Sequence, residues 1–135
     1  MPKYGKRSLE NLNSCDPKLQ ELFNEVIKHV DCSIICGHRG EEAQNKAFNE
    51  GHSKLKFPDS KHNKKPSKAV DSPPYFKVKP HIRWNDKEAF CLFAGKVLGI
   101  AAMMGIKIRW GGNWDGDDEL HDQTFFDGPH FELID

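Results

Sequence analysis

The sequence predicts a single compact α+β domain in which a small antiparallel sheet packs with two long helices. Two observations on the whole chain predict this class. The 135 residues match the usual length of one domain, and no repeat or linker divides them. Two long helical patterns occur together with several short strand-like segments. We therefore expect residues 1–135 to form one domain.

The first long helix is predicted to begin at Asp16. Its carboxylate can cap the helix, and Pro17 suits the first helical turn. Apolar residues then continue at helical spacing as far as Val30. Residues 33–36 are short, apolar and partly β-branched, which predicts a strand directly after this helix.

The next elements are shorter. Residues 41–49 are expected to be helical, with Gly51 as the stop signal. Residues 51–68 are rich in Lys, Ser, Asn and Pro, which is typical of a loop. Residues 69–71 are expected to begin a strand that two prolines cut short. Residues 75–84 could contain one more short strand.

The second long helix is predicted to follow Asn85, which can form a capping box with Glu88, and to end at Gly105. One face of this helix is apolar, and we interpret it as core rather than as a binding groove. The residues of this face are Phe90, Phe93, Val97, Ile100, Ala101 and Met104.

Two strands are predicted near the end of the chain. Residues 106–110 alternate apolar and basic side chains, which indicates a strand with one wet face and with Trp110 against the core. Residues 111–128 form a glycine- and acid-rich loop. Residues 130–134 alternate again and close the chain as a strand.

Composition excludes several classes of protein. The chain has 20 basic and 20 acidic residues, so it lacks the basic excess of a general nucleic-acid binder. Its longest apolar stretch, residues 97–106, is shorter than the roughly 20 residues of a membrane span. The first residues do not resemble a signal peptide, so we expect synthesis in a cytoplasm. The lysine-rich segment 61–68 is interpreted as a solvated loop, or else as a patch for an anionic surface.

The four cysteines do not form a regular disulfide pattern, and we expect them to be reduced. Cys32 and Cys36 lie in or beside an apolar run and are interpreted as small core residues. Their spacing could also chelate a metal, but no second cysteine pair accompanies them.

Four other residues suggest an open zinc site. His62 precedes the predicted strand 69–71, Asp71 ends it, and His130 opens the last strand. Two imidazoles and one carboxylate would leave the fourth position of zinc free for water. Asp127 lies one tight turn before His130, where a carboxylate that is not a ligand could act as the catalytic base. On spacing alone, surface histidines and turn aspartates remain an alternative.

The loop before Asp127 also holds an acidic cluster. Its oxygens could bind calcium, although the EF-hand pattern is absent, and a solvated acidic loop is the alternative. The neighbouring pair His121 and Asp122 is interpreted as a surface pair, or else as an orienting or substrate-contacting pair. The cluster comprises Asp115, Asp117, Asp118 and Glu119.

Several motifs taken together resemble the M15 zinc peptidases. "SKH" followed by "AVD", and then "DGPHFEL", resemble the metal-binding segments of that family. "GHRGEEAQ", "RWNDKEAF" and "RWGGNWDGD" favour its branch of phage L-alanyl-D-glutamate endopeptidases over the D-alanyl-D-alanine peptidases. The resemblance runs from about residue 17 to the end of the chain, with the motifs in the same order. It implies a fold like that of hedgehog domains and D-alanyl-D-alanine peptidases.

The resemblance also implies a role for individual residues. His62, Asp71 and His130 resemble the zinc ligands, Asp127 resembles the catalytic base, and Arg39 resembles the arginine that holds the scissile carbonyl as it becomes an oxyanion. Ser60 and Trp114 lie where substrate-contacting residues of such enzymes would lie.

The function implied is that of a phage endolysin, a monomer that cuts the L-alanyl-D-glutamate bond of the peptidoglycan stem peptide. It would be made in the host cytoplasm and act on the wall after release, with zinc and with calcium as a further candidate. Two alternatives stay open: a D-alanyl-D-alanine carboxypeptidase or dipeptidase, and a zinc-containing binding module without catalysis.

The sequence departs from the family pattern in two places. The usual spacing from ligand His to Asp is seven residues, whereas Asp71 lies nine after His62. We expect the two extra residues to bulge outward, because extending a loop costs little; His52 is the other upstream histidine, without the Ser-x-His context. Asn113 stands where the family has aspartate.

Overall fold

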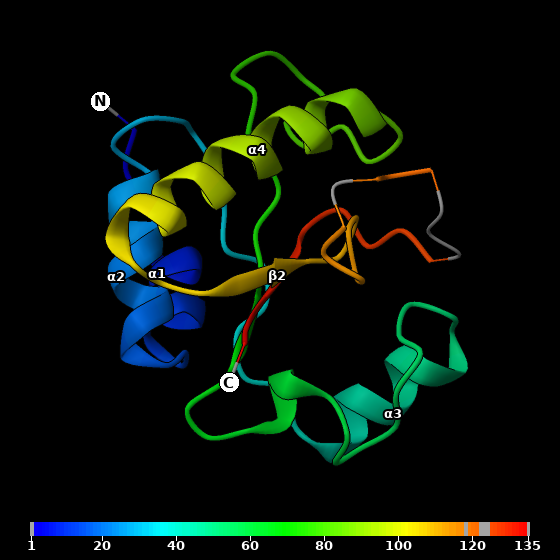
Figure 1. The fold of residues 1–135 in the computed structure, drawn as a ribbon. Coiled ribbons are helices and arrows are strands. Elements are labelled where there is room, and N and C mark those ends of the chain that lie inside the picture. Colours follow the sequence, from blue (N-terminus) through cyan, green and yellow to red (C-terminus); the bar gives the residue numbers. More distant parts are fainter. Residues whose placement is uncertain (1, 118, 122–124, 135) are drawn as a thin grey trace.

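The computed structural model describes residues 2–117, 119–121 and 125–134, and it has the predicted α+β architecture (Figure 1). Three short strands form an antiparallel sheet in the order β1-β3-β2. The elements are α1 (Lys6–Asn13), α2 (Pro17–Val26), α3 (Glu41–Asn49), the 3-10 turn η1 (Lys61–Asn63), β1 (Ala69–Asp71), α4 (Lys87–Met104), β2 (Ile108–Trp110) and β3 (His130–Leu133).

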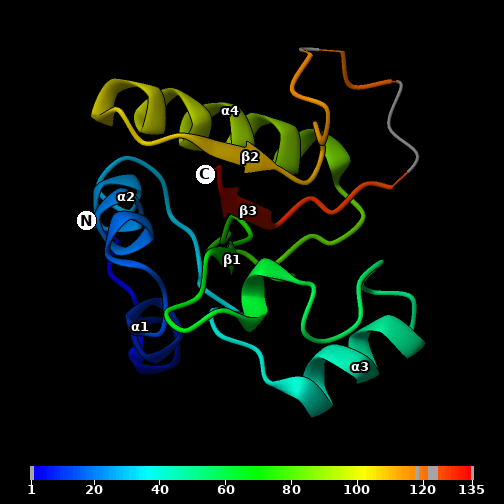
Figure 2. The same cartoon turned by 60° about the horizontal axis from the view of Figure 1, so that its bottom comes forward.

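The helices lie on different sides of the sheet. α1, α2 and α4 gather on one side, whereas α3 lies apart from them on the other side of the strands in both views (Figures 1 and 2). None of the helices in the described residues is long and apolar enough to cross a membrane.

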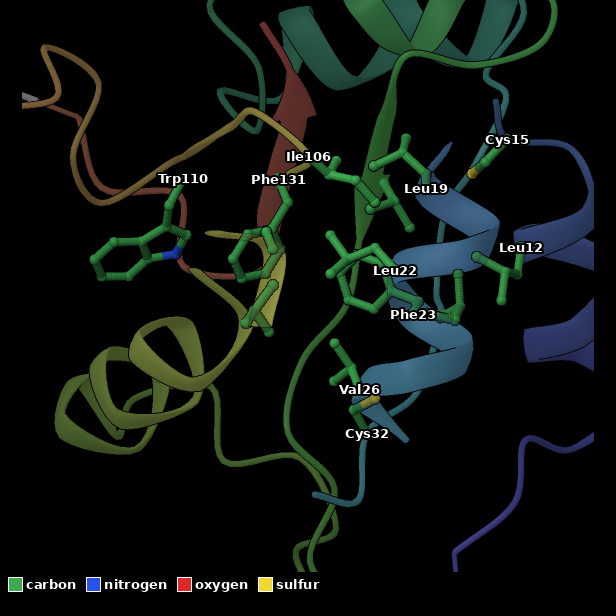
Figure 3. Packing of buried hydrophobic residues seen from close by; sticks show 14 of the residues in the cluster. Leu12, Cys15, Leu19, Leu22, Phe23, Val26, Cys32, Ile106, Trp110 and Phe131 are labelled. Atoms are coloured by element: carbon green, nitrogen blue, oxygen red, sulfur yellow. The ribbon is translucent and has the colours of Figure 1, made fainter. Parts of the chain in front are cut away.

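The core lies between α2, α4 and the sheet. Phe131 of β3 is fully buried and packs edge-on against Phe23 of α2 and Phe93 of α4, with ring centroids 5.8 and 6.1 Å apart. Figure 3 shows Phe131 between Trp110 and the side chains of α2. Trp110 is buried as predicted, and its indole N–H donates to the Gly128 carbonyl at 2.7 Å.

Strand register sends alternate residues to opposite faces of the sheet. On the core face, Val70 of β1 lies opposite Phe131. On the other face, Asp71 lies opposite His130, and Arg109 of β2 lies opposite Glu132. The second face therefore carries the polar groups, and it is where the predicted site residues meet.

The N-terminal part differs from the prediction in three ways. α1 was not predicted, because Leu9 and Leu12 are the only apolar residues among its eight, which is too few to show a helical repeat. α2 begins at its predicted cap but ends at Val26, before the apolar pattern stops. Residues 33–36 do not form a strand: they make only isolated bridges on one side, while the Ser8 hydroxyl and Asn11 amide of α1 bond the backbone of Ile34 on the other.

The central part differs at two positions. α4 is capped by Asp86, whose carboxylate accepts from the Ala89 N–H at 3.0 Å, and not by Asn85. Gly105 ends the helix in the left-handed conformation, as predicted, at φ 73°. Residues 75–84 form bends and turns rather than a strand, and Pro73 and Pro74 before the segment and Pro80 within it have no backbone N–H to donate to a ladder.

Candidate metal centre and active site

The sheet places two of the predicted ligands opposite each other. Asp71, at the end of β1, pairs in register with His130, at the start of β3. Side chains of directly opposed residues on one face lie close together. The Asp71 Oδ1 and His130 Nδ1 atoms are 3.2 Å apart. The pairing of these two residues thus follows from strand register alone.

The third predicted ligand comes from η1. The hydroxyl of Ser60 accepts from the His62 backbone N–H at 3.2 Å and caps this turn. The Lys68 N–H bonds to the Lys61 carbonyl at 3.0 Å and closes the loop that follows, while residues 64–66 are exposed. The two extra residues therefore bulge outward, and His62 Nε2 still lies 3.2 Å from Asp71 Oδ1.

The hydrogen bonds of the two imidazoles leave one nitrogen of each facing the carboxylate. His62 Nδ1 lies 2.8 Å from the Gly37 carbonyl, which can only accept, so this nitrogen carries a proton. His130 Nε2 lies 2.8 Å from Glu132 Oε1 and donates to it. In their neutral forms both rings then direct a bare lone pair at one oxygen of Asp71. Either a second proton on each ring or a cation must occupy this position.

The charges of the metal-free centre agree with this geometry. Burial lowers the pKa of His62, but the Asp71 carboxylate outweighs it and raises that pKa to about 10. Burial also lowers the pKa of His130, and hydrogen bonds to Asp71 and Glu132 raise it to about 9. Burial raises the pKa of Asp71, yet the two imidazoles hold it well below its usual range. A divalent cation could replace the two extra protons without changing the net charge.

Glu132 was not predicted as a site residue. Its carboxylate accepts from His130 Nε2 and fixes the orientation of that ring, as carboxylates commonly do for metal-binding histidines. Arg109 and Lys61 approach its other oxygen at 3.1 and 3.7 Å. Burial raises the pKa of Glu132, but the bond to His130 and these cations lower it. Its place two residues after His130, on the same strand face, was the available signal.

Asp127 lies beside the centre but does not share its hydrogen bonds. Asp127 Oδ2 is 4.0 Å from His130 Nδ1, and its backbone N–H donates to the Gly111 carbonyl at 2.9 Å. A side chain at Gly111 would collide with the Asp127 backbone, so glycine permits this approach. Burial and the negative charge of Asp71 raise the pKa of Asp127 to about 6. This value suits a group that exchanges protons near neutral pH.

Arg39 reaches the centre from the segment before α3. Its guanidinium donates to Asp71 Oδ2 at 3.3 Å and to the Gln44 side-chain carbonyl at 3.0 Å. Gln44 is fully buried in α3 and also donates to the backbone of Leu55. Gln44 thereby fixes the position of Arg39, and the predicted Arg-x-x-x-x-Gln segment contained the signal for this role.

All the predicted site residues line one cavity of about 1010 Å³. Trp114 lines it, with its indole tilted over the His130 ring at a centroid distance of 5.3 Å. Ser60 also lines it, although its hydroxyl already caps η1. His52 lies in the cavity wall, but it is highly exposed and pairs with Glu50 rather than with the centre.

Cys36 is not the core residue that the sequence suggested, whereas Cys32 is. The Cys36 thiol is only partly buried, and its Sγ lies 3.8 Å from His62 Nδ1. Among the described residues, Cys36, His62 and Asp71 offer ligand atoms within 4.8 Å of one another. The centre therefore has two possible third donors, Cys36 and His130. All four cysteines are free.

The acidic loop gives no support to the calcium prediction. Asp115, Asp117 and Glu119 are exposed, and each accepts a backbone N–H from its own loop. Asp118 and Asp122, which belonged to the predicted cluster and to the pair with His121, lie outside the described residues.

Comparison with known proteins places this geometry in a family. Residues 1–134 match the family model described as phage L-alanyl-D-glutamate peptidase. The L-alanyl-D-glutamate peptidase of Escherichia phage T5 is 34% identical over 139 residues, which cover 98% of each chain. The crystal structure of the Serratia marcescens L-Ala D-Glu endopeptidase ChiX superposes with a TM-score of 0.77 at 26% identity, covering 99% of this chain and 90% of that one. The chain belongs to the phage L-alanyl-D-glutamate peptidase family.

Proposed function

We propose that this enzyme is a zinc-dependent endopeptidase that hydrolyses the L-alanyl-D-glutamate bond of the peptidoglycan stem peptide. The names of its relatives support the substrate. The main support for a metal comes from two imidazoles that each lie 3.2 Å from the same Asp71 oxygen. The other nitrogen of each imidazole is already hydrogen-bonded. That arrangement of lone pairs needs a cation or two protons.

We assign the zinc ligands to His62, Asp71 and His130, and not to Cys36. The thiol of Cys36 lies beside His62 Nδ1, whose proton is held by the Gly37 carbonyl. The free nitrogens of both imidazoles instead face the same carboxylate oxygen. Two histidines and one carboxylate form a donor set typical of catalytic zinc, which keeps a further position for water.

Zinc held by this set would activate a water molecule and polarise the scissile carbonyl. Asp127, with its raised pKa, accepts a proton from the attacking water and delivers it to the departing amine. The guanidinium of Arg39 stabilises the negative charge that develops on the carbonyl oxygen. Its contacts with Gln44 and Asp71 hold that cation in place before substrate arrives.

The proposed setting is the cell wall of a phage-infected bacterium. The relative from phage T5 supports an endolysin that is made in the host and acts on peptidoglycan. The whole chain, residues 1–135, would form the catalytic domain, and we expect it to act as a monomer.

The test is a digest of purified peptidoglycan with the zinc-loaded protein, followed by mass spectrometry. The proposal predicts fragments with a free N-terminal D-glutamate. Release of D-alanine would instead indicate the carboxypeptidase chemistry, and absence of turnover would indicate a binding module. Asp127→Asn should lower the rate about 10²–10⁴-fold while zinc stays bound. Asp117→Asn, a change in an exposed acid of the preceding loop, is the matched control and should leave the rate unchanged.

A further inference from the structure

Trp84 forms an exposed aromatic surface in the wall of the cavity. Its side chain is 55% exposed, although it is one of the largest apolar side chains of the protein. It lines the same cavity as the metal centre, and the catalytic chemistry above does not use it. The exposed face of an indole offers a large and rigid apolar contact surface to a ligand in this cavity.

The indole of Trp84 is held in place from behind. Its ring lies nearly parallel to that of Phe90, with centroids 6.0 Å apart and an interplanar angle of 25°. Phe90 is buried at the start of α4 and cannot easily move. A ring fixed in this way loses little conformational entropy when a ligand stacks on it.

The position of this surface relative to the centre follows from Phe90. A side chain added at Gly128 would come within 2.8 Å of the Phe90 ring, so the two residues pack closely. Gly128 directly follows Asp127, the proposed proton carrier. The Trp84 surface is thus only one ring removed from the turn that carries Asp127.

The charges of the cavity wall are unevenly distributed. Its lysines and arginine all come from residues 39–61, a segment that also contributes Asp59, whereas the other acids of the wall belong to the metal centre and its flanking loops: Asp71, Asp115, Asp127 and Glu132. The stretch 84–90 contributes only Trp84 and Phe90, both uncharged. The nearby cations of Arg83 and Lys87 lie over the rings of Phe76 and Phe126.

The charges of the proposed substrate are also unevenly distributed, on the two sides of its scissile bond. The D-glutamyl side of the scissile bond carries carboxylates, which suit the cations Arg39, Lys54 and Lys61 of segment 39–61. On the L-alanyl side the stem is joined by an amide to a muramic acid sugar, whose carboxyl group is consumed in that bond. This sugar is uncharged and offers an apolar face of C–H groups, which fits the electron-rich face of an indole.

We propose that Trp84, backed by Phe90, is the binding subsite for the N-acetylmuramic acid residue attached to the L-alanine of the stem. This inference rests on the proposed function, because it assumes that the stem peptide occupies the cavity. It makes glycan-linked stems better substrates than free stem peptides.

The kinetic test compares two substrates that share one stem: a disaccharide-linked muropeptide and the same peptide with an acetyl group in place of the sugar. Trp84→Ala should lower kcat/KM for the muropeptide about tenfold, mainly through KM, and change that for the free peptide less than twofold. Trp84→Phe should retain most of the wild-type kcat/KM for the muropeptide, because it keeps an aromatic ring at this position. Equal losses on both substrates, or no loss on either, would contradict the subsite.

A control and a binding measurement separate this inference from the proposed function. Leu92→Ala removes another exposed apolar side chain, 66% exposed on α4 and outside the cavity lining, and should affect neither substrate. If the wild-type protein cleaves neither substrate, the proposed function fails. The subsite is then decided by titrating the N-acetylglucosaminyl-N-acetylmuramic acid disaccharide whose lactyl carboxyl group is capped as a methylamide, so that the probe is uncharged like the sugar in the stem. A shift of the Trp84 indole N–H resonance supports the subsite, and no shift at millimolar sugar overturns it.

Discussion

The two faces of the three-stranded sheet differ in what fixes their side chains. On the core face, Val70 and Phe131 are completely buried among the apolar side chains of α2 and α4, where shape and volume decide the packing. On the other face, Asp71, His130 and Glu132 are held by directional polar contacts. Successive residues of β3 alternate between these environments. One four-residue strand thus contributes stability through one face and chemistry through the other.

The largest effect is expected on the core face. Phe131→Ala should lower the free energy of unfolding by about 3–5 kcal/mol, because it removes a ring that contacts two helices and leaves a cavity. Denaturant unfolding of the metal-free protein measures this loss. Met103→Ala, at a side chain that is 91% exposed, is the control and should change stability by less than about 0.5 kcal/mol. A loss below 1 kcal/mol for Phe131→Ala would mean that this face does not carry the core.

The next effect concerns pH and belongs to the polar face. In the metal-free protein His62 and His130 have pKa values of about 10 and about 9, so both are protonated at neutral pH. Zinc must displace about two protons, and its affinity should fall about 100-fold, or about 2.7 kcal/mol, for each unit of falling pH. Competition with a chelator at pH 6, 7 and 8 measures the slope.

Two variants sharpen this prediction. His130→Ala removes one of the two protons and should halve the slope as well as weaken binding, whereas Cys36→Ser should leave the slope near two protons. The stability of the metal-free protein has the opposite pH dependence: it falls as pH rises, whereas zinc affinity increases. The raised pKa values stabilise the fold below the unfolded histidine pKa of about 6.5, and this contribution is lost as pH rises through 9 to 10. A zinc affinity independent of pH would contradict the assigned ligands.

A smaller effect is expected when only the orientation of a ligand is disturbed. Glu132→Gln keeps an acceptor for His130 Nε2 but removes its negative charge, so zinc affinity should fall about tenfold. Arg109→Gln is the matched control, because it removes a partner of Glu132 and leaves the bond to His130 intact. If both variants lose affinity equally, Glu132 acts through the packing of the strand rather than through the imidazole.

Sequence patterns were sufficient to predict the elements that are determined by local features such as caps and apolar faces. The cap at Asp16, the glycine stop at Gly105 and the apolar face of α4 are local features, and the structure has all three. The segment 33–36 looked like a strand because apolar β-branched residues also suit an extended chain with other partners. Its backbone is bonded by Ser8 and Asn11 from α1, a helix whose two apolar residues are too few to show a helical repeat.

The site also contains residues that the sequence predicted and residues that it did not. The residues His62, Asp71, His130 and Asp127 were predicted from motif order and residue chemistry, and the fold brings them to one cavity. The thiol of Cys36 was misplaced, because its position beside His62 depends on a bridge between distant segments. Contacts that arise from tertiary packing leave no periodic pattern in the sequence.

The smallest effect is expected outside both faces of the sheet, at the helix caps. Asp16 caps α2 through the Lys18 N–H at 2.9 Å and also pairs with Lys68 at 2.6 Å. Asp16→Ala should cost about 1 kcal/mol of stability and leave zinc affinity unchanged. Asp86→Ala, which removes the α4 cap alone, is the comparison and should cost less.

The pH dependence of the Asp16 cap is opposite to that of the metal-free histidines. The bond to Lys68 lowers the pKa of Asp16, so its contribution is present above the unfolded aspartate pKa of about 3.9 and is lost as pH falls below it. The difference in unfolding free energy between wild type and Asp16→Ala should therefore shrink from pH 6 to pH 3. Because the pair is partly exposed and screened by salt, the pH-sensitive part should also shrink at high ionic strength. A difference that persists unchanged at pH 3 would assign the effect to helix propensity instead of charge.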